Sequence, residues 1–157
     1  MDENSSTARR VLDPGVDHLD EGECWRYLSV ASFGRLAVVD DDGRVDIFPV
    51  NHAVDHADDH DSLVLRTADG AKLRALASGR EIAYEVDGVT GSRSWPRTAW
   101  SVVLRGRAET ITDLAGLAVL RSVAVAPWQG GSKSNVVRLS GSVSGRRFAV
   151  TGSGWWS

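Results

Sequence analysis

The chain has 157 residues, enough for one domain that buries roughly 70% of its unfolded surface. Its formal net charge is −3 and its basic residues are scattered, which argues against a general nucleic-acid binder with a basic face. No apolar run approaches the roughly 20 residues of a membrane span, so we expect neither a nucleic-acid nor a membrane partner.

The first element in chain order is a polar segment, residues 1–16, which is expected to be a flexible tail before a single domain over residues 17–157. Asp20 and Glu23 have capping-box spacing, which predicts a helix start. Cys24 falls on the apolar face of that helix and is expected to be a small buried residue. As the single cysteine, it also fits a reducing cytoplasm, where we expect the protein to be.

Strand patterns follow the helix. Residues 35–40 and 45–54 are expected to pair as a tight hairpin, because Gly43 accepts the positive φ of the DDGR turn between them. A third strand is predicted over residues 62–67.

The second half alternates between short helices and strands. We expect Asp69 to cap a helix that stops at Gly79, and Asp113 to cap one over residues 114–125. Gly106 is expected to mark a bend or bulge in its strand. Four strands are predicted here, over residues 81–87, 99–111, 135–141 and 145–150.

This order predicts a mainly β (α+β) fold. A tight first hairpin and few helices exclude a doubly wound parallel sheet, which needs helical crossovers. A small antiparallel barrel with a few short helices is expected, since closure removes exposed strand edges.

The segment over residues 63–72, LVLRTADGAK, carries the most chemical information. A strand ends at Arg66 and Thr67, a turn contains Gly70, and Lys72 lies in the first turn of the expected helix. This segment brings unpaired N–H groups together with a guanidinium, a hydroxyl and an ammonium. Such a set of donors favours the binding of a phosphate monoester. The alternative is a solvated arginine and lysine that flank a turn.

Pro49 lies inside an otherwise good strand, where it removes one ladder hydrogen bond. Neighbouring backbone groups are then available to the polar rim of a flavin ring, and Asn51 offers both a donor and an acceptor. The alternative is a protected sheet edge.

Four stretches together resemble the pyridoxamine 5′-phosphate oxidase-like family of FMN-binding split β-barrels. They are GRLAVVDDDGRVDIFPVN (34–51), LVLRTADGAKL (63–73), IAYEVD (82–87) and WSVVLRGRAE (100–109). The resemblance implies an antiparallel split β-barrel that works as a homodimer, with FMN bound between the subunits.

The resemblance also implies which residues bind the cofactor. The FMN phosphate would contact Arg66, Thr67 and Lys72. The ring would lie along the backbone of Phe48, Pro49, Val50 and Asn51, and would be approached from the partner subunit by Trp100 and Ser101.

Two departures from the family pattern stand out. Ala71 occupies a position where relatives commonly carry serine or threonine, so one hydroxyl contact to the phosphate is absent. The chain ends in GSGWWS, without the arginine and histidine contacts to substrate of the true pyridoxamine phosphate oxidases. The resemblance therefore implies a fold and a cofactor rather than that reaction.

Histidines recur every four residues at His52, His56 and His60, among several aspartates. On a helix this spacing would suggest a metal site. Here it spans a strand end and a loop, and we expect a solvated connection and no metal. Trp95 and Trp128 are expected to be packing residues, with Trp128 a candidate to cover a ligand.

The expected function is that of an FMN-dependent oxidoreductase with a small-molecule substrate of unknown identity. No side chain stands out as an acid or base, so no catalytic residue is assigned. Two alternatives are a deazaflavin-dependent reductase on the same fold and a non-enzymatic protein that binds flavin or haem.

Overall fold

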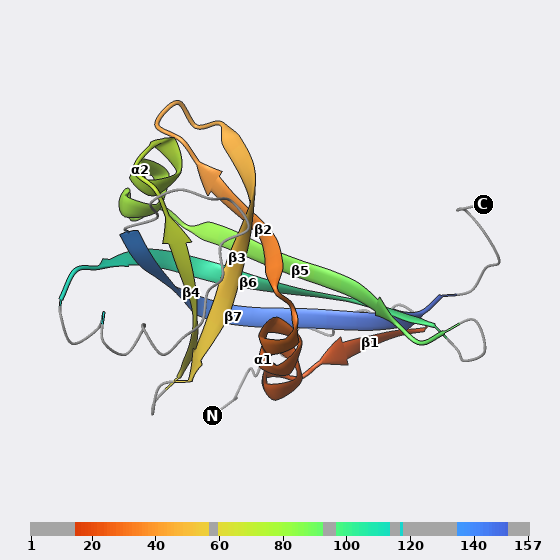
Figure 1. The fold of residues 1–157 in the computed structure, drawn as a ribbon. Coiled ribbons are helices and arrows are strands. Elements are labelled where there is room, and N and C mark those ends of the chain that lie inside the picture. The colour runs from red at the N-terminus through yellow and green to blue at the C-terminus, as the bar shows by residue number, and fades with distance from the viewer. Residues whose placement is uncertain (1–14, 57–59, 93–96, 114–116, 118–134, 151–157) are drawn as a thin grey trace, which may run out of the picture.

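The computed structural model describes residues 15–56, 60–92, 97–113, 117 and 135–150 (Figure 1). Its strands are β1 (Val16–Leu19), β2 (Phe33–Val39), β3 (Val45–His56), β4 (Asp61–Thr67), β5 (Ile82–Thr90), β6 (Thr98–Ile111) and β7 (Asn135–Ala149). Two helices, α1 (Glu21–Val30) and α2 (Ala71–Ala77), pack against this sheet. Most of the tail predicted over residues 1–16, and all but Leu117 of the helix predicted over 114–125, lie outside the described residues.

The strands form one antiparallel sheet in the order β1-β7-β4-β3-β2-β5-β6, and an additional pairing of β7 with β6 closes it. Six strands thus complete a barrel, while β1 extends the sheet at β7 beyond the part that pairs with β4. The far ends of β5, β6 and β7 continue as a long arm beside β1 (Figure 1). The predicted mainly β, antiparallel barrel is confirmed.

Strand β1 begins at Val16, at the predicted end of the tail, and pairs with residues 145–148 of β7. The prediction for the last strands was wrong. Two strands were expected after residue 135, but β7 is continuous and pairs with β6 from Val136 to Ala149. Its middle residues are serine, valine and glycine, a composition that resembles a turn but can extend when both edges are paired.

Gly106 marks a close approach between strands rather than a bulge. The register runs unbroken through it, with Ile82 of β5 on one side and Gly141 of β7 on the other. A Cβ atom at Gly106 would lie 1.9 Å from the Ser140 carbonyl oxygen, so only glycine fits.

The structure confirms the predicted capping box and the two predicted glycine positions, but not the predicted cap at Asp69. Asp20 is the N-cap of α1, and its side chain and that of Glu23 form both hydrogen bonds of the capping box. Asp69 does not cap α2, because Gly70 holds the N-cap position without a side-chain bond. Gly43 and Gly79 have φ angles of +78° and +73°, as their predicted turn and helix stop require.

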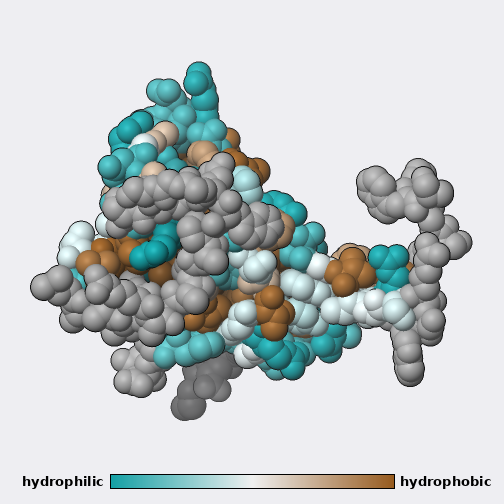
Figure 2. Space-filling view, in the orientation of Figure 1, coloured by the Kyte–Doolittle hydropathy of each residue, from teal (hydrophilic) through white to brown (hydrophobic). Residues whose placement is uncertain are grey.

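One main core fills the barrel and the space under α1. Cys24 is fully buried there, beside Gly145, and burial raises the pKa of its thiol, as expected of a packing residue. Apolar residues also reach the surface, where brown patches lie among polar residues in Figure 2. No helix in the described part of the chain is long and apolar enough to cross a membrane.

Candidate functional site: the split between β3 and β4

Strands β3 and β4 pair along only part of their length. Their ladder runs from His56 opposite Asp61 to His52 opposite Leu65. Beyond that rung, residues 45–51 of β3 pair with β2, while Arg66 and Thr67 of β4 pair with β7. The two strands therefore part where Pro49, which has no N–H group, interrupts the donor pattern of β3. Apart from Trp100 and Ser101 on β6, the sequence-predicted residues of the flavin site lie on both sides of this split.

Lys72 and Phe48 meet across the split. The Lys72 ammonium lies 5.0 Å from the centre of the Phe48 ring, a cation–π contact between α2 and β3. This contact brings one cation of the predicted phosphate site to the segment predicted to line the ring.

Arg66 and Thr67 lie on opposite faces of β4, because side chains alternate along a strand. Thr67 is buried and donates its hydroxyl hydrogen to the Ala68 carbonyl, at 3.2 Å. Arg66 is exposed and makes no ion pair with a described residue. An anion that contacts both must therefore lie over the open end of β4, within reach from either face.

The turn after β4 is tied to β7 by Asn135. Its side-chain amide donates to the Asp69 carboxylate at 2.8 Å and to the Thr67 carbonyl at 3.4 Å. Sequence reasoning missed Asn135, which is 66 residues away from Asp69 and has no local signal. The helix that follows the turn has only seven residues, so side chains rather than a helix dipole must supply most of any grip on an anion.

Two buried polar side chains hold β3 from inside the barrel. The Tyr84 hydroxyl contacts the Val50 carbonyl oxygen at 3.0 Å and the His52 ring nitrogen Nδ1 at 2.7 Å. The other ring nitrogen, Nε2, lies 2.7 Å from the Leu28 carbonyl oxygen of α1. Burial lowers the pKa of His52 and raises that of Tyr84, so both are neutral near pH 7.

This inner support was not predicted from the sequence. Tyr84 lies in the strand predicted over residues 81–87, and His52 was placed near a strand end, without a partner inside the barrel. Alternation along β3 should have placed His52 inside, because it follows the inward-facing Phe48 and Val50 at a spacing of two. His56 instead lies near the strand end, exposed, with its Nδ1 atom 2.7 Å from the Asp61 carboxylate.

Three outward features complete the predicted set. Pro49 is exposed, and Asn51 donates its side-chain amide hydrogen to the Ser32 carbonyl at 3.2 Å. Ser101 faces outward from β6, whereas its neighbour Trp100 is buried in its own subunit, stacked on Tyr27 at 4.4 Å. Of this pair, Ser101 is therefore placed to meet a partner, and its contact with the cofactor stays a prediction. Trp95 and Trp128 lie outside the described residues.

Comparison with known proteins agrees with this geometry. Residues 20–147 match the family model described as pyridoxamine 5′-phosphate oxidase. A solved Corynebacterium glutamicum structure, provisionally named as such an oxidase, is 33% identical, with a TM-score of 0.75 over 90% of this chain and 99% of that one.

Two further solved structures are described as FAD-binding proteins. The one from Mycobacterium smegmatis is 31% identical, with a TM-score of 0.69 over 85% of this chain and 99% of that one. The one from Mesorhizobium loti is 26% identical, with a TM-score of 0.66 over 84% of this chain and 97% of that one. With its split barrel and a family match over most of its length, this chain belongs to the pyridoxamine 5′-phosphate oxidase family.

Proposed function

We propose that the chain binds a flavin nucleotide, with FMN as the simplest case, in the split between β3 and β4 and acts as a flavin-dependent oxidoreductase. The observation that carries this proposal is the parting of the two strands beyond His52 and Leu65. Arg66, Thr67 and Lys72 border the opening. The two cations supply donors for a phosphate, and Thr67 would add one on turning its hydroxyl away from the Ala68 carbonyl.

The charged, polar and apolar groups at the split suit the binding of a flavin nucleotide. The exposed Arg66 guanidinium has no carboxylate partner among the described residues, so a phosphate would not compete with an ion pair. The segment from Phe48 to Asn51 offers an apolar ring, a proline and backbone groups for the flavin. Ala71 adds no hydroxyl, so the side chains of Arg66, Thr67 and Lys72 supply most of the grip.

A bound flavin would itself supply the hydride or electron transfer. The chain would bind and orient it, with Tyr84 and His52 fixing β3 from the inner side. Neither of these two residues is a candidate acid or base, because both are buried beneath the segment that would face the ring. The substrate is therefore expected to meet the flavin directly.

The two FAD-binding relatives favour a flavin over a deazaflavin or haem. FAD contains the isoalloxazine ring, the ribityl chain and the first phosphate of FMN. The donors at the split would therefore serve either nucleotide in the same way.

The visible spectrum of the freshly purified protein tests the proposal. We expect the two visible bands of an oxidised flavin, and free FMN or FAD in the supernatant after denaturation. A single deazaflavin band or an intense Soret band would replace the proposed cofactor. A colourless protein that does not bind added FMN or FAD would contradict the proposal altogether.

A further inference from the structure

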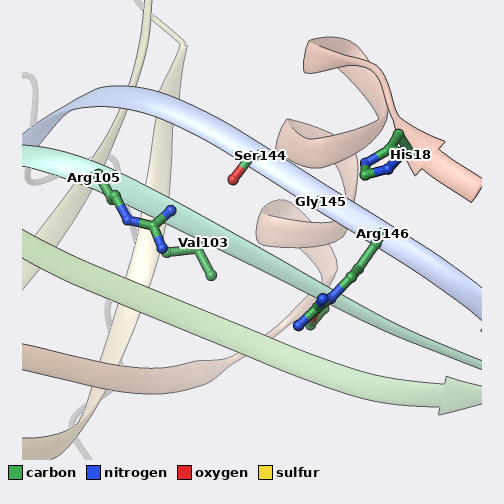
Figure 3. Close-up of a pocket in the computed structure, with 7 residues that line it drawn as sticks. His18, Val103, Arg105, Ser144, Gly145 and Arg146 are labelled. Carbon is green, nitrogen blue, oxygen red and sulfur yellow. The ribbon is translucent and has the colours of Figure 1, made fainter. Parts of the chain in front are cut away.

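A second polar site lies on the outward face of the barrel and includes Ser101. It is a shallow pocket of about 230 Å³ where β1, β6 and β7 run side by side (Figure 3). Its lining residues come from these three strands and are His18, Ser101, Val103, Arg105, Ser144, Gly145 and Arg146. None of them lies at the split between β3 and β4 of the same subunit, and Ser101 is the one that is also predicted to approach the flavin of the partner subunit.

The strand register explains why these side chains gather. Arg146 of β7 lies opposite both Ser101 of β6 and His18 of β1, and Ser144 lies opposite Val103. Arg105 is four residues further along β6 than Ser101, roughly 13 Å on the same face. In Figure 3 the side chains of Arg105 and Arg146 extend toward each other from opposite sides of the pocket, with Ser144 between them.

The two guanidinium groups have no ion-pair partner in the described part of the chain. The side chains of Arg105 and Arg146 form neither an ion pair nor a hydrogen bond with any residue that the structure describes. Two carboxylates stand on the same face, since Glu85 lies opposite Val103 and Asp87 lies opposite Ser101. Arg35 binds both of them, at 2.8 and 2.7 Å.

The pocket therefore holds two hydroxyl groups and two guanidinium groups without an ion-pair partner among the described residues, with an imidazole at its rim. The neighbouring Glu85 and Asp87 share the single positive charge of Arg35. Planar guanidinium groups bind phosphate oxygens through paired hydrogen bonds, and serine hydroxyls can donate to the remaining oxygens. We propose that this pocket is a binding site for a phosphate-bearing ligand.

The phosphate could come from one of two sources. It could be the second phosphate of FAD held at a partner subunit, in which case this inference rests on the proposed function. It could equally belong to a separate small anionic molecule, which needs no flavin. Inorganic pyrophosphate has the phosphate groups that both sources share, so it is the probe for either.

Isothermal titration of pyrophosphate into the full chain at constant ionic strength tests the site. The wild type is expected to bind at least about tenfold more tightly than Arg105→Gln/Arg146→Gln, because charge-assisted hydrogen bonds to an anion are lost. The matched control is Arg26→Gln/Arg44→Gln, which removes the same charge from exposed residues with ion pairs of only 3.9 and 4.0 Å. The control is expected to bind pyrophosphate as the wild type does.

Parallel titrations with FMN and FAD identify the source. If FAD affinity falls in the pocket variant while FMN affinity does not, the ligand is the dinucleotide. If only pyrophosphate affinity falls, the ligand is a separate anion, and this result holds even if no flavin binds at all. Equal pyrophosphate affinity in the wild type and the pocket variant, or an equal loss in the control, would overturn the site.

Discussion

Tyr84 and His52 show how single buried polar residues support the proposed site. Their contacts run from the Leu28 carbonyl in α1, through the imidazole and the hydroxyl, to the Val50 carbonyl in β3. The Tyr84 ring also stands against Gly34, where a Cβ atom would lie 2.7 Å from it. The ring and its hydroxyl thus fix the position of β2 and β3 together.

Tyr84→Phe is expected to lower the free energy of unfolding by about 1–3 kcal/mol, because it removes the buried hydroxyl that contacts His52 and Val50. Urea denaturation measures this change. Tyr27→Phe is the matched control, since the Tyr27 ring stacks on Trp100 and its hydroxyl makes no hydrogen bond with a described residue. It should change stability by no more than about 0.5 kcal/mol. Equal losses in the two variants would show that the hydroxyl contacts of Tyr84 do not matter.

His52 makes stability depend on pH. Burial lowers its pKa in the folded chain, so below the unfolded value of about 6.5 the unfolded chain binds more protons. The free energy of unfolding is therefore expected to fall as the pH drops through that window and to be unaffected by His52 above it. Thermal unfolding between pH 8 and pH 5 should show a smaller pH dependence in His52→Gln than in the wild type. An unchanged pH dependence would contradict this account.

At the scale of whole elements, long antiparallel strands set the shape of the barrel. Strands β6 and β7 pair without interruption, and Gly106 faces Gly141 at their closest approach. A Cβ atom at Gly141 would lie 2.0 Å from the Arg105 carbonyl oxygen. The two glycines therefore let the strands meet where side chains would push them apart.

Gly141→Ala is expected to destabilise the protein by about 2 kcal/mol or more, because backbone atoms would have to move. Ser142→Ala, at the neighbouring exposed position, should stay within about 0.5 kcal/mol of the wild type. Chemical denaturation of the two variants measures both effects. A Gly141→Ala protein as stable as the wild type would mean that the strands separate easily at this point.

Local signals decided which elements the sequence could predict. The β2–β3 hairpin was found because Gly43 marks its turn, and α1 was found from the spacing of Asp20 and Glu23. The single strand β7 was missed, because its extended state depends on β6, β4 and β1, which are far away in sequence. In the same way, the strand-turn-helix pattern pointed to Arg66 and Lys72. The contacts of Asn135 and His52 are tertiary and left little local trace.

The outward face of the barrel bears on the assembly of the whole molecule. Large exposed apolar residues are Val30 on α1 and, in the sheet, Phe33, Val45, Ile47, Val89 and Phe148. The alternation of each strand places all five of the sheet residues on its outward side. Such a face fits the symmetric homodimer that the family resemblance implies, with Ser101 on the same side.

Ile47→Glu is therefore expected to weaken the dimer by roughly tenfold or more, because a charge would be buried unpaired in the interface. Val30→Glu is the control, since this equally exposed residue lies on α1 and should leave the dimer intact. Sedimentation equilibrium measures both. A wild-type protein that stays monomeric at micromolar concentration would rule out the homodimer.

The central claim is that the split between β3 and β4 binds the phosphate of a flavin nucleotide. Fluorescence titration of FMN and riboflavin against the wild type and Arg66→Ala tests it most directly, with Arg74→Ala, an exposed arginine on α2, as the control. We expect Arg66→Ala to lose about 2 kcal/mol of FMN binding, roughly thirtyfold in affinity, while riboflavin binding stays weak and nearly unchanged. Equal FMN affinity in the wild type and Arg66→Ala would show that the phosphate does not bind at this site.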